Sequence, residues 1–383
     1  MAIHFTNQEL RERQSRTCTA LAEQGLDGLL IFRQESMYYL TGYDSFGYVF
    51  FQCLYLTVDG RMVLLTRAPD LRQAEHTSVI DDIRIWRDTE NAEPAQLLRD
   101  IVAEFGGQRG RIGIEWEAYG LTAHNGQRVA AALDGFCRLE DQSTLVSRLR
   151  LTKSAAELTY VRRAAELADA ALEAALQTAG AGAFEGDILA AMQGAVFAGG
   201  GDYPGNPFII GSGRDALLCR YFSGRRHLSE QDQLTLEFAG CYRHYHACLM
   251  RTIIVGEANA RHLTLFDACR QALLACEAAV RPGASMAEVF AAHAGIFDGL
   301  GLADHRLNAC GYSLGTTFAP NWMDWPMFYE GNPTIMAPNM VFFLHMILMD
   351  SDTGHAMTLG RTVAVTESGS EPLSKAALDL QRV

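Results

Sequence analysis

The stretch from Leu234 to Gly256 constrains the fold more than any other part of the sequence. It reads LTLEFAGCYRHYHACLMRTIIVG, an apolar run, a polar and aromatic turn, and a second run that ends in β-branched residues. This pattern predicts two strands joined as a hairpin. Glu237 lies in the middle of the first strand. A carboxylate there costs free energy unless it is paired or used in chemistry, so the hairpin is the first candidate for a functional site.

Three residues on the second half of this hairpin offer partners for Glu237. His246 fits a general acid or base near neutral pH, and it equally fits a core histidine satisfied by hydrogen bonds. Arg251 fits a cation that neutralises Glu237 or keeps it ionised. Tyr245 fits either a site residue or ordinary strand packing. The sequence alone leaves these alternatives open.

Length and composition describe a protein of two domains. A chain of 383 residues exceeds what one hydrophobic core usually holds. The sequence has no apolar run of 18 residues, and its polar N-terminus lacks a signal-peptide core, so we expect a cytoplasmic protein. A net charge of −13 argues against nucleic acid and anionic membrane surfaces as partners. Nine cysteines without a CxxC pair predict reduced thiols.

Alternating strand and helix patterns predict a small α/β domain over residues 1–150. We expect helices over 7–25, near 70–76, over 94–105 and over 118–134, and strands over 27–32, 49–58, 62–66 and 111–115.

The second domain is predicted over residues 151–383. It opens with the clearest helix of the chain, 154–178, because Ser154 and Glu157 form a capping box ahead of apolar residues at helical spacing. Further helices are expected over 187–198, 258–280 and 286–299, and strands over 207–211, 233–239, 250–255, 340–349 and 361–366.

Three more polar stretches in this domain fit either structural or functional roles. The glycines of 199–226 suit turns, and Asp202 fits a turn residue or one that orients a neighbour. The loop-like stretch 310–333 is rich in aromatic residues, which either wall a small pocket or pack on the sheet. His345 lies in an apolar strand and is either structural or part of a site.

Short motifs of this chain, in order, resemble those of the creatinase and aminopeptidase P superfamily, the pita-bread fold. The resemblance spans essentially the whole chain and implies an α+β protein with an N-terminal creatinase-like α/β domain and a C-terminal pita-bread domain. The motifs are Thr41-Gly42-Tyr43, Leu151-Thr152-Lys153-Ser154 with Glu157, Arg251-Thr252 with Gly256, Pro338-Asn339-Met340, and Thr366-Glu367-Ser368-Gly369.

The resemblance also shows where metallopeptidases of that superfamily hold two metal ions, with two Asp, one His and two Glu. A cage of carboxylates suits hard divalent ions, and this chain does not keep it. We therefore expect no metal and no other cofactor. The matching positions are Glu237, Cys248, Tyr312, His345 and either Gly360 or Arg361.

The metal-free ectoine hydrolases of the superfamily are similar over more of the sequence. Their likeness implies that Glu237 is a nucleophile toward the ring amidine carbon of a small substrate. Beside Glu237 we predict His246 as a proton shuttle and Arg251 as a cation that holds Glu237 ionised, with Tyr312 as a further catalytic residue. The shared stretches are Leu40–Asp44, Gln52-Cys53, Gly200–Pro204, Glu237–Thr252 and Cys310–Tyr312 with Pro320 and Trp322.

We expect the partner to be a small molecule, bound by residues from both domains. Arg220 stands where related enzymes have a substrate-loop histidine, and it would hold a substrate carboxylate. Tyr43 belongs to a loop that, by resemblance, reaches the neighbour's site in a homodimer. The full set of expected substrate contacts is Asp202, Tyr203, Arg220, Trp322, Trp325, His345 and Tyr43.

The expected function is metal-independent hydrolysis of a C–N bond in an ectoine-like or creatine-like compound. A metal-dependent Xaa-Pro-type peptidase or lyase on the same fold is one alternative. A catalytically inactive binding protein is the other.

Overall fold

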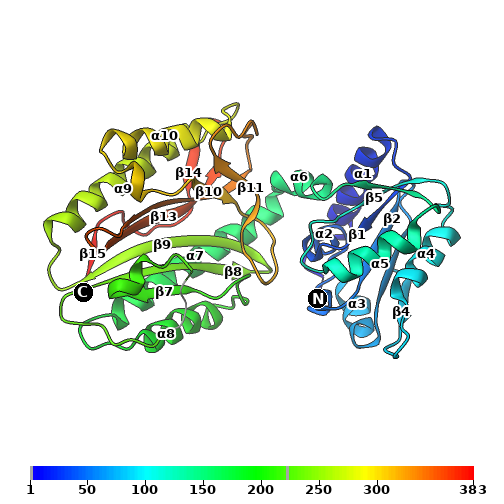
Figure 1. The fold of residues 1–383 in the computed structure, drawn as a ribbon, viewed down its shortest axis with the longest axis horizontal. Coiled ribbons are helices and arrows are strands. Elements are labelled where there is room, and N and C mark those ends of the chain that lie inside the picture. Colours follow the sequence, from blue (N-terminus) through cyan, green and yellow to red (C-terminus); the bar gives the residue numbers. More distant parts are fainter. Residues whose placement is uncertain (1–2, 221–223) are drawn as a thin grey trace. The chain divides into compact units, whose positions relative to one another are not determined.

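The computed structural model describes residues 3–220 and 224–383, and the chain forms two compact units, residues 1–150 and 151–383 (Figure 1). Each unit is built around one sheet.

The N-terminal unit has a six-stranded mixed sheet in the order β4-β3-β2-β1-β5-β6. Apolar residues of α4 and α5 cover one face and those of α1 and α2 cover the other, which accounts for the fully buried central strands. The strands are β1 (Gly28–Ile31), β2 (Cys53–Thr57), β3 (Met62–Arg67), β4 (Ile83–Trp86), β5 (Arg111–Ile114) and β6 (Arg138–Asp141). The helices are α1 (Asn7–Glu23), α2 (Gln34–Thr41), α3 (Leu71–Thr77), α4 (Pro94–Glu104), α5 (Ala123–Leu133) and α6 (Leu145–Leu151).

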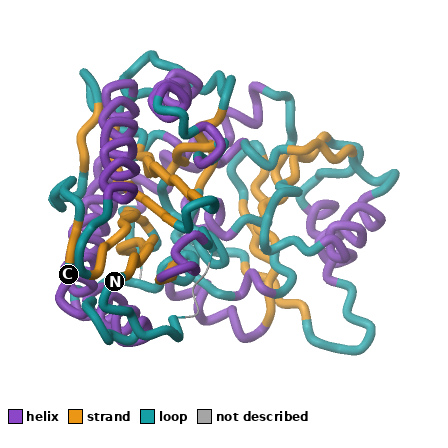
Figure 2. The backbone as a smooth tube through the Cα atoms, turned by 60° about the vertical axis from the view of Figure 1, so that its left-hand side comes forward, coloured by secondary structure: helices purple, strands orange, loops and turns teal. Residues whose placement is uncertain are grey.

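The C-terminal unit has a nine-stranded sheet, whose main path is β11-β10-β12-β13-β9-β8-β7. The strands are β7 (Ile209–Ser212), β8 (Asp232–Tyr242), β9 (Tyr245–Val255), β10 (Ala309–Ser313), β11 (Asp324–Tyr329), β12 (Val341–Asp350), β13 (His355–Val365), β14 (Ser370–Pro372) and β15 (Gln381–Arg382). The long helices are α7 (Ala155–Thr178), α8 (Glu185–Ala198), α9 (Ala260–Ala279) and α10 (Met286–Gly299). Figure 2 colours the helices of the chain purple and its strands orange.

The long helices of this unit contact different parts of its sheet. Helix α7 packs on β8 and β9, while α9 packs on β12 and β13 (Figure 1). Helix α7 comes so close to β8 that a Cβ on Gly240 would lie 1.9 Å from the carbonyl oxygen of Ala164, so this strand position requires glycine. Gly240 pairs with Ala247, and the residues on that side of the hairpin face the helices. The alternate residues, among them Glu237, point to the opposite face.

The hairpin predicted from the sequence is confirmed as β8 and β9, and its turn places Arg243 and His244 at φ values of 51° and 64°. The capping box at Ser154 and Glu157 is confirmed at the start of α7. Strand β9 begins at Tyr245, earlier than predicted, because the turn occupies only two residues.

Several predicted element boundaries are wrong. The predicted strand 49–58 begins only at Cys53, since Gly47–Val49 form a 3₁₀ turn. The stretch 310–333 is less of a loop than predicted, because it contains most of β10 and all of β11. Strands β4 and β6 and helix α6 were not predicted; all three are short, and the two strands are only partly buried, so their patterns are weak.

Within the described part of the chain, none of the helices combines the length and apolar character needed to cross a bilayer.

Candidate active site

Strand pairing places the site residues in one row across the C-terminal sheet. Ile209 of β7 lies opposite Glu237, Glu237 opposite Met250, Met250 opposite Gly360, and Gly360 opposite His345. Directly paired residues share a face of the sheet, so Glu237 and His345 project from the same face although they are more than a hundred positions apart in the sequence. This face is the one opposite the long helices.

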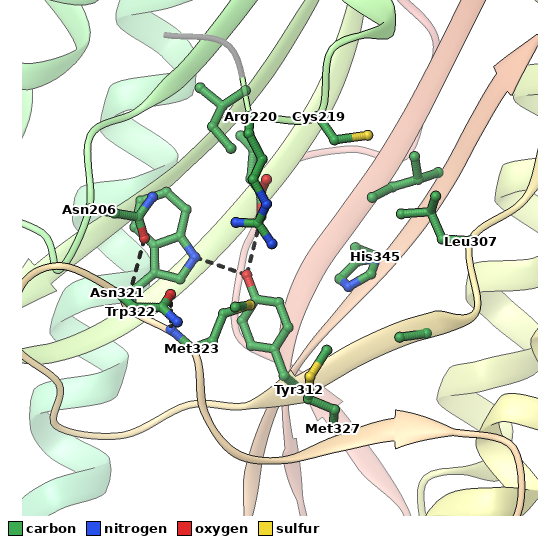
Figure 3. Close-up of a pocket in the computed structure, with 14 residues that line it drawn as sticks. Asn206, Cys219, Arg220, Leu307, Tyr312, Asn321, Trp322, Met323, Met327 and His345 are labelled. Carbon is green, nitrogen blue, oxygen red and sulfur yellow. Dashed lines mark hydrogen bonds between the residues drawn. The ribbon is translucent and has the colours of Figure 1, made fainter. Parts of the chain in front are cut away.

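A cavity of about 130 Å³ opens on this face, and Figure 3 shows the side chains around it. Its lining combines a carboxyl, a guanidinium, an imidazole, a phenol and several apolar groups. The lining residues are Asn206, Ile209, Cys219, Arg220, Glu237, Leu307, Ala309, Tyr312, Asn321, Trp322, Met323, Met327, His345 and Ile347.

A chain of two hydrogen bonds ends on Glu237. The indole Nε1 of Trp322 donates to the Tyr312 hydroxyl at 2.9 Å, and that hydroxyl donates to Glu237 Oε1 at 3.1 Å (Figure 3). Because the indole N–H can only donate, it directs the phenol proton toward the carboxyl group. The sequence resemblance named all three residues, and the structure brings them together.

Burial raises the pKa of Glu237 to about 7, while the Tyr312 hydrogen bond and the positive charge of Arg220 act in the opposite direction. A carboxyl group with this pKa exists in both protonation states near neutral pH. The same burial raises the pKa of the Tyr312 hydroxyl well above its usual value, so Tyr312 stays a neutral donor.

Arg220 and His345 line other parts of the same cavity. Arg220 follows the 3₁₀ segment Gly213–Leu217 and has an exposed side chain. His345 is 6% exposed, and burial lowers its pKa to about 4. At neutral pH the cavity therefore holds a cation at Arg220 and a neutral imidazole at His345.

The five positions that correspond to metal ligands in the resembling metallopeptidases do not fit two divalent ions. Tyr312 presents a neutral phenol, and burial raises the pKa of the Cys248 thiol well above its usual value. Gly360 offers no side chain, and a Cβ there would lie 2.9 Å from the ring of Phe343. Only Glu237 keeps a carboxylate, so hard ions lack their preferred oxygen donors.

Within residues 3–220 and 224–383, three His, Cys, Asp or Glu ligand atoms lie within 4.8 Å of one another in a different group. It consists of His305, Asp350 and Asp352. Asp350 already bonds to Arg261 at 2.7 Å. None of the five positions above belongs to that group.

His246 does not lie in the lining of the cavity. It pairs with Cys241, four positions along β8 from Glu237. Its Nε2 accepts a hydrogen bond from the Gly205 N–H at 2.9 Å, and its Nδ1 lies 3.0 Å from the Thr317 hydroxyl. Burial lowers its pKa to about 3. The structure therefore favours the alternative of a histidine satisfied by hydrogen bonds over that of a proton shuttle.

The hypothesis that Arg251 pairs with Glu237 is wrong. Arg251 lies opposite Leu236, and neighbouring strand residues point to opposite faces, so Arg251 faces the helices. Its Nη1 donates to the carbonyl oxygens of Met250 at 2.8 Å and Gly360 at 2.7 Å. The cation that favours the ionised form of Glu237 is Arg220.

Four expected substrate contacts lie outside the cavity lining. Asp202 accepts a hydrogen bond from the backbone N–H of Arg243 and so holds the hairpin turn. Tyr203 is 81% exposed and packs edge-on against Phe197. Trp325 is partly buried against the apolar core of the C-terminal unit.

Tyr43 is the fourth, and it is fully buried within the N-terminal unit. Its hydroxyl donates to Gln52 Oε1 at 3.2 Å. A side chain without exposed surface cannot reach a neighbouring subunit unless its own core opens. The homodimer that the resemblance implies stays a prediction.

Sequence reasoning missed the apolar and amide residues of the lining, which include Asn206, Asn321, Met323 and Met327. Met323 and Met327 belong to the aromatic stretch that either walls a pocket or packs on the sheet. Their place in that stretch was the signal by which they could have been predicted. Residues 221–223 of the glycine-rich stretch lie outside the described part of the chain.

Known proteins match the chain over both units. A model of metallopeptidase family M24 matches residues 159–367, and a model of the creatinase/prolidase N-terminal domain matches residues 13–152. An ectoine hydrolase of Halomonas elongata is 26% identical over 98% of this chain and 97% of its own. An Xaa-Pro dipeptidase of Pyrococcus furiosus is 22% identical over 97% of this chain and 100% of its own.

Solved structures share the fold. A recombinant prolidase from Thermococcus sibiricus has a TM-score of 0.88 at 19% identity, with 97% of this chain and 99% of that chain covered. The likeness therefore extends over the full length of both chains.

Proposed function

The chain belongs to metallopeptidase family M24, and we propose that this M24-family hydrolase cleaves a C–N bond of a small nitrogen compound without a metal ion, with Glu237 as the nucleophile. Two features of the cavity together support this proposal. Its carboxyl group has a pKa of about 7, and the positions of the family's other metal ligands hold a thiol, a phenol, an imidazole and a glycine.

The reaction consumes one water molecule. With an amidinium substrate, the Glu237 carboxylate forms a C–O bond to the amidine carbon, and the positive charge of the substrate is neutralised. One nitrogen then takes up a proton and departs as an amine, while the lone pair of the other nitrogen forms a C=N bond. Water adds to the same carbon, the C–O bond to Glu237 breaks, and an amide remains. Water gives up two protons: one replaces the proton taken by the leaving nitrogen, and the other ends on the amine product.

The substrate itself would help to ionise Glu237. In the free protein the carboxyl group is only partly ionised at neutral pH, because its pKa is about 7. A cationic amidinium next to it favours the carboxylate. Tyr312 donates a hydrogen bond to that carboxylate and orients it toward the cavity. Substrate binding and nucleophile activation are thus the same event.

The cavity suits a small zwitterion. Its volume of about 130 Å³ is well below the roughly 300–1,000 Å³ of sites for drug-sized ligands. Arg220 offers a guanidinium for a substrate carboxylate, and Trp322 offers an apolar wall for a ring. A compact cyclic amidine carboxylate or a creatine-like compound meets these requirements, and the similarity to an ectoine hydrolase supports the first.

A second candidate is a peptidase of the Xaa-Pro type, because a relative that matches over the whole chain is named an Xaa-Pro dipeptidase. The test therefore measures turnover by the purified protein of three classes of compound: cyclic amidine carboxylates, creatine and Xaa-Pro dipeptides. We expect turnover of one of the first two classes and none of the dipeptides.

The decisive variant is Glu237→Gln, with Glu230→Gln as the control because Glu230 is exposed and does not line the cavity. We expect Glu237→Gln to fold and to lose at least 10³-fold in rate, which is roughly the loss that follows removal of a group essential to chemistry. Acid quenching of the wild type with substrate should leave a covalent adduct on the peptide that contains Glu237. Normal turnover by Glu237→Gln would end the proposal.

A further inference from the structure

His345 is a buried polar group on the wall of the cavity that the proposed chemistry does not use. It projects from β12, is 6% exposed, and has the rings of Tyr312 and Phe343 at centroid distances of 5.6 Å each. Its Nδ1 is buried and has no hydrogen-bond partner among the residues that the structure describes. The ring of His345 lines the cavity, so a bound ligand is the group that can satisfy one of its nitrogens.

The position of His345 relates it to the reacting end of the cavity. His345 and Glu237 lie in the same row of the sheet, separated by β13 and β9. Three strand spacings put their Cα atoms no more than about 14 Å apart, which leaves room for a small ring between the two side chains. Figure 3 shows Trp322 and Asn206 on one side of Tyr312 and His345 with Leu307 on the other. A substrate held at Glu237 therefore presents its far side to His345.

The charge state of His345 limits what it can recognise. Burial lowers its pKa to about 4, so the ring is neutral at physiological pH, with one nitrogen as donor and the other as acceptor. A neutral imidazole does not attract a carboxylate as a guanidinium does, and Arg220 already supplies the cation of the cavity. The group that suits His345 is an uncharged one that can donate or accept a hydrogen bond.

We infer that His345 is a specificity-determining residue that selects substrates with an uncharged hydrogen-bonding substituent, such as a ring hydroxyl, on the side facing β12. This inference rests on the proposed function. It adds to it a substrate class: a small amidine carboxylate that bears such a substituent, in preference to the unsubstituted compound.

The test compares a cyclic amidine carboxylate with its ring-hydroxylated analogue. We expect the wild type to favour the hydroxylated compound by roughly 10- to 100-fold in kcat/KM, the range that corresponds to leaving one buried polar group unsatisfied. His345→Met should bring this ratio close to one, and His345→Asn, which keeps a donor and an acceptor, should retain part of it. His293→Met is the matched control, since His293 is also buried with an unpartnered Nδ1 but lies in α10 outside the cavity lining.

Binding separates this inference from the proposed function. The affinities of the two compounds for Glu237→Gln, measured by calorimetry, report on His345 even if Glu237 is not the nucleophile. A tighter fit of the hydroxylated compound that disappears in the double variant with His345→Met supports the inference. Equal affinities of the two compounds, or a ratio that His345→Met leaves unchanged, overturns the inference.

Discussion

Glu237 shows how one side chain can be tuned by opposing influences. Burial favours the protonated carboxyl group, whereas Tyr312 and Arg220 favour the carboxylate, and the balance gives a pKa of about 7. Without the hydrogen bond from Tyr312, burial would raise the pKa of Glu237 further. The reactivity of Glu237 therefore depends on a residue that touches it from β10, a strand far away in the sequence.

This dependence predicts a pH effect. A nucleophile must be ionised, so kcat/KM of the wild type should rise with pH through about 7 and level off above it. Removing the Tyr312 hydroxyl with Tyr312→Phe takes away a group that lowers the pKa of Glu237, so the midpoint should move to higher pH. The pH–rate profile of one substrate measures this, and the activity lost should be largest on the acidic side.

Tyr329→Phe serves as the control for that profile, because Tyr329 is exposed and lies outside the cavity lining. Its midpoint should match that of the wild type. A Tyr312→Phe profile with an unmoved midpoint would show that the phenol does not act on Glu237.

Strand pairing explains which parts of the site could be read from the sequence. The hairpin pattern around Glu237 predicts two strands, and both exist. The pattern does not state which face each residue takes, because that depends on the register between β8 and β9. Arg251 looks like a partner of Glu237 in the sequence but lies opposite Leu236 and faces the helices. His345 shares the face of Glu237 only through two intervening strands, a relationship that no local pattern contains.

His246 has a structural role in the same hairpin, and this makes a prediction about stability. It connects β9 to two loops through Gly205 and Thr317. Asn206 follows Gly205, and the Thr317 hydroxyl donates to the carbonyl oxygen of Trp322 at 3.4 Å; both Asn206 and Trp322 line the cavity. His246→Ala removes a fully buried ring and leaves polar partners unsatisfied, so we expect a loss of about 3 kcal/mol in the free energy of unfolding. Urea denaturation measures it, with the exposed His124→Ala as the control.

The activity of His246→Ala distinguishes positioning from proton transfer. If His246 only positions the loops, kcat/KM falls while the pH midpoint stays at about 7, and His246→Gln recovers part of the rate. A His246→Ala variant of normal stability whose pH midpoint moves away from about 7 would instead reinstate the proton shuttle.

At the scale of the whole molecule, the motifs of the sequence predict the pita-bread architecture because they mark turns and strand ends that recur in order. The motifs do not predict whether a side chain is buried or free to contact a ligand. Tyr43 belongs to such a motif, yet its side chain is fully enclosed, and the motif alone does not reveal this. The fold thus separates two tasks within the C-terminal unit: the helices stabilise one face of the sheet, and the other face is left for the cavity.

The positions that correspond to metal ligands lack suitable donor atoms, and this predicts how the protein responds to removal of metal ions. A metal ion that holds a site together stabilises the folded state, so its removal lowers the melting temperature and the activity. In this chain the space next to Gly360 contains the ring of Phe343, and the Cys248 thiol keeps its proton because burial raises its pKa. We therefore expect prolonged dialysis against EDTA to change neither the melting temperature nor kcat/KM, and elemental analysis to find less than one metal ion per chain. Gly360→Glu restores a carboxylate in sequence but should destabilise the protein, because its Cβ would lie 2.9 Å from the Phe343 ring. Loss of activity in EDTA, recovered by adding Mn²⁺ or Zn²⁺ alone, would favour the metal-dependent peptidase over the metal-free hydrolase.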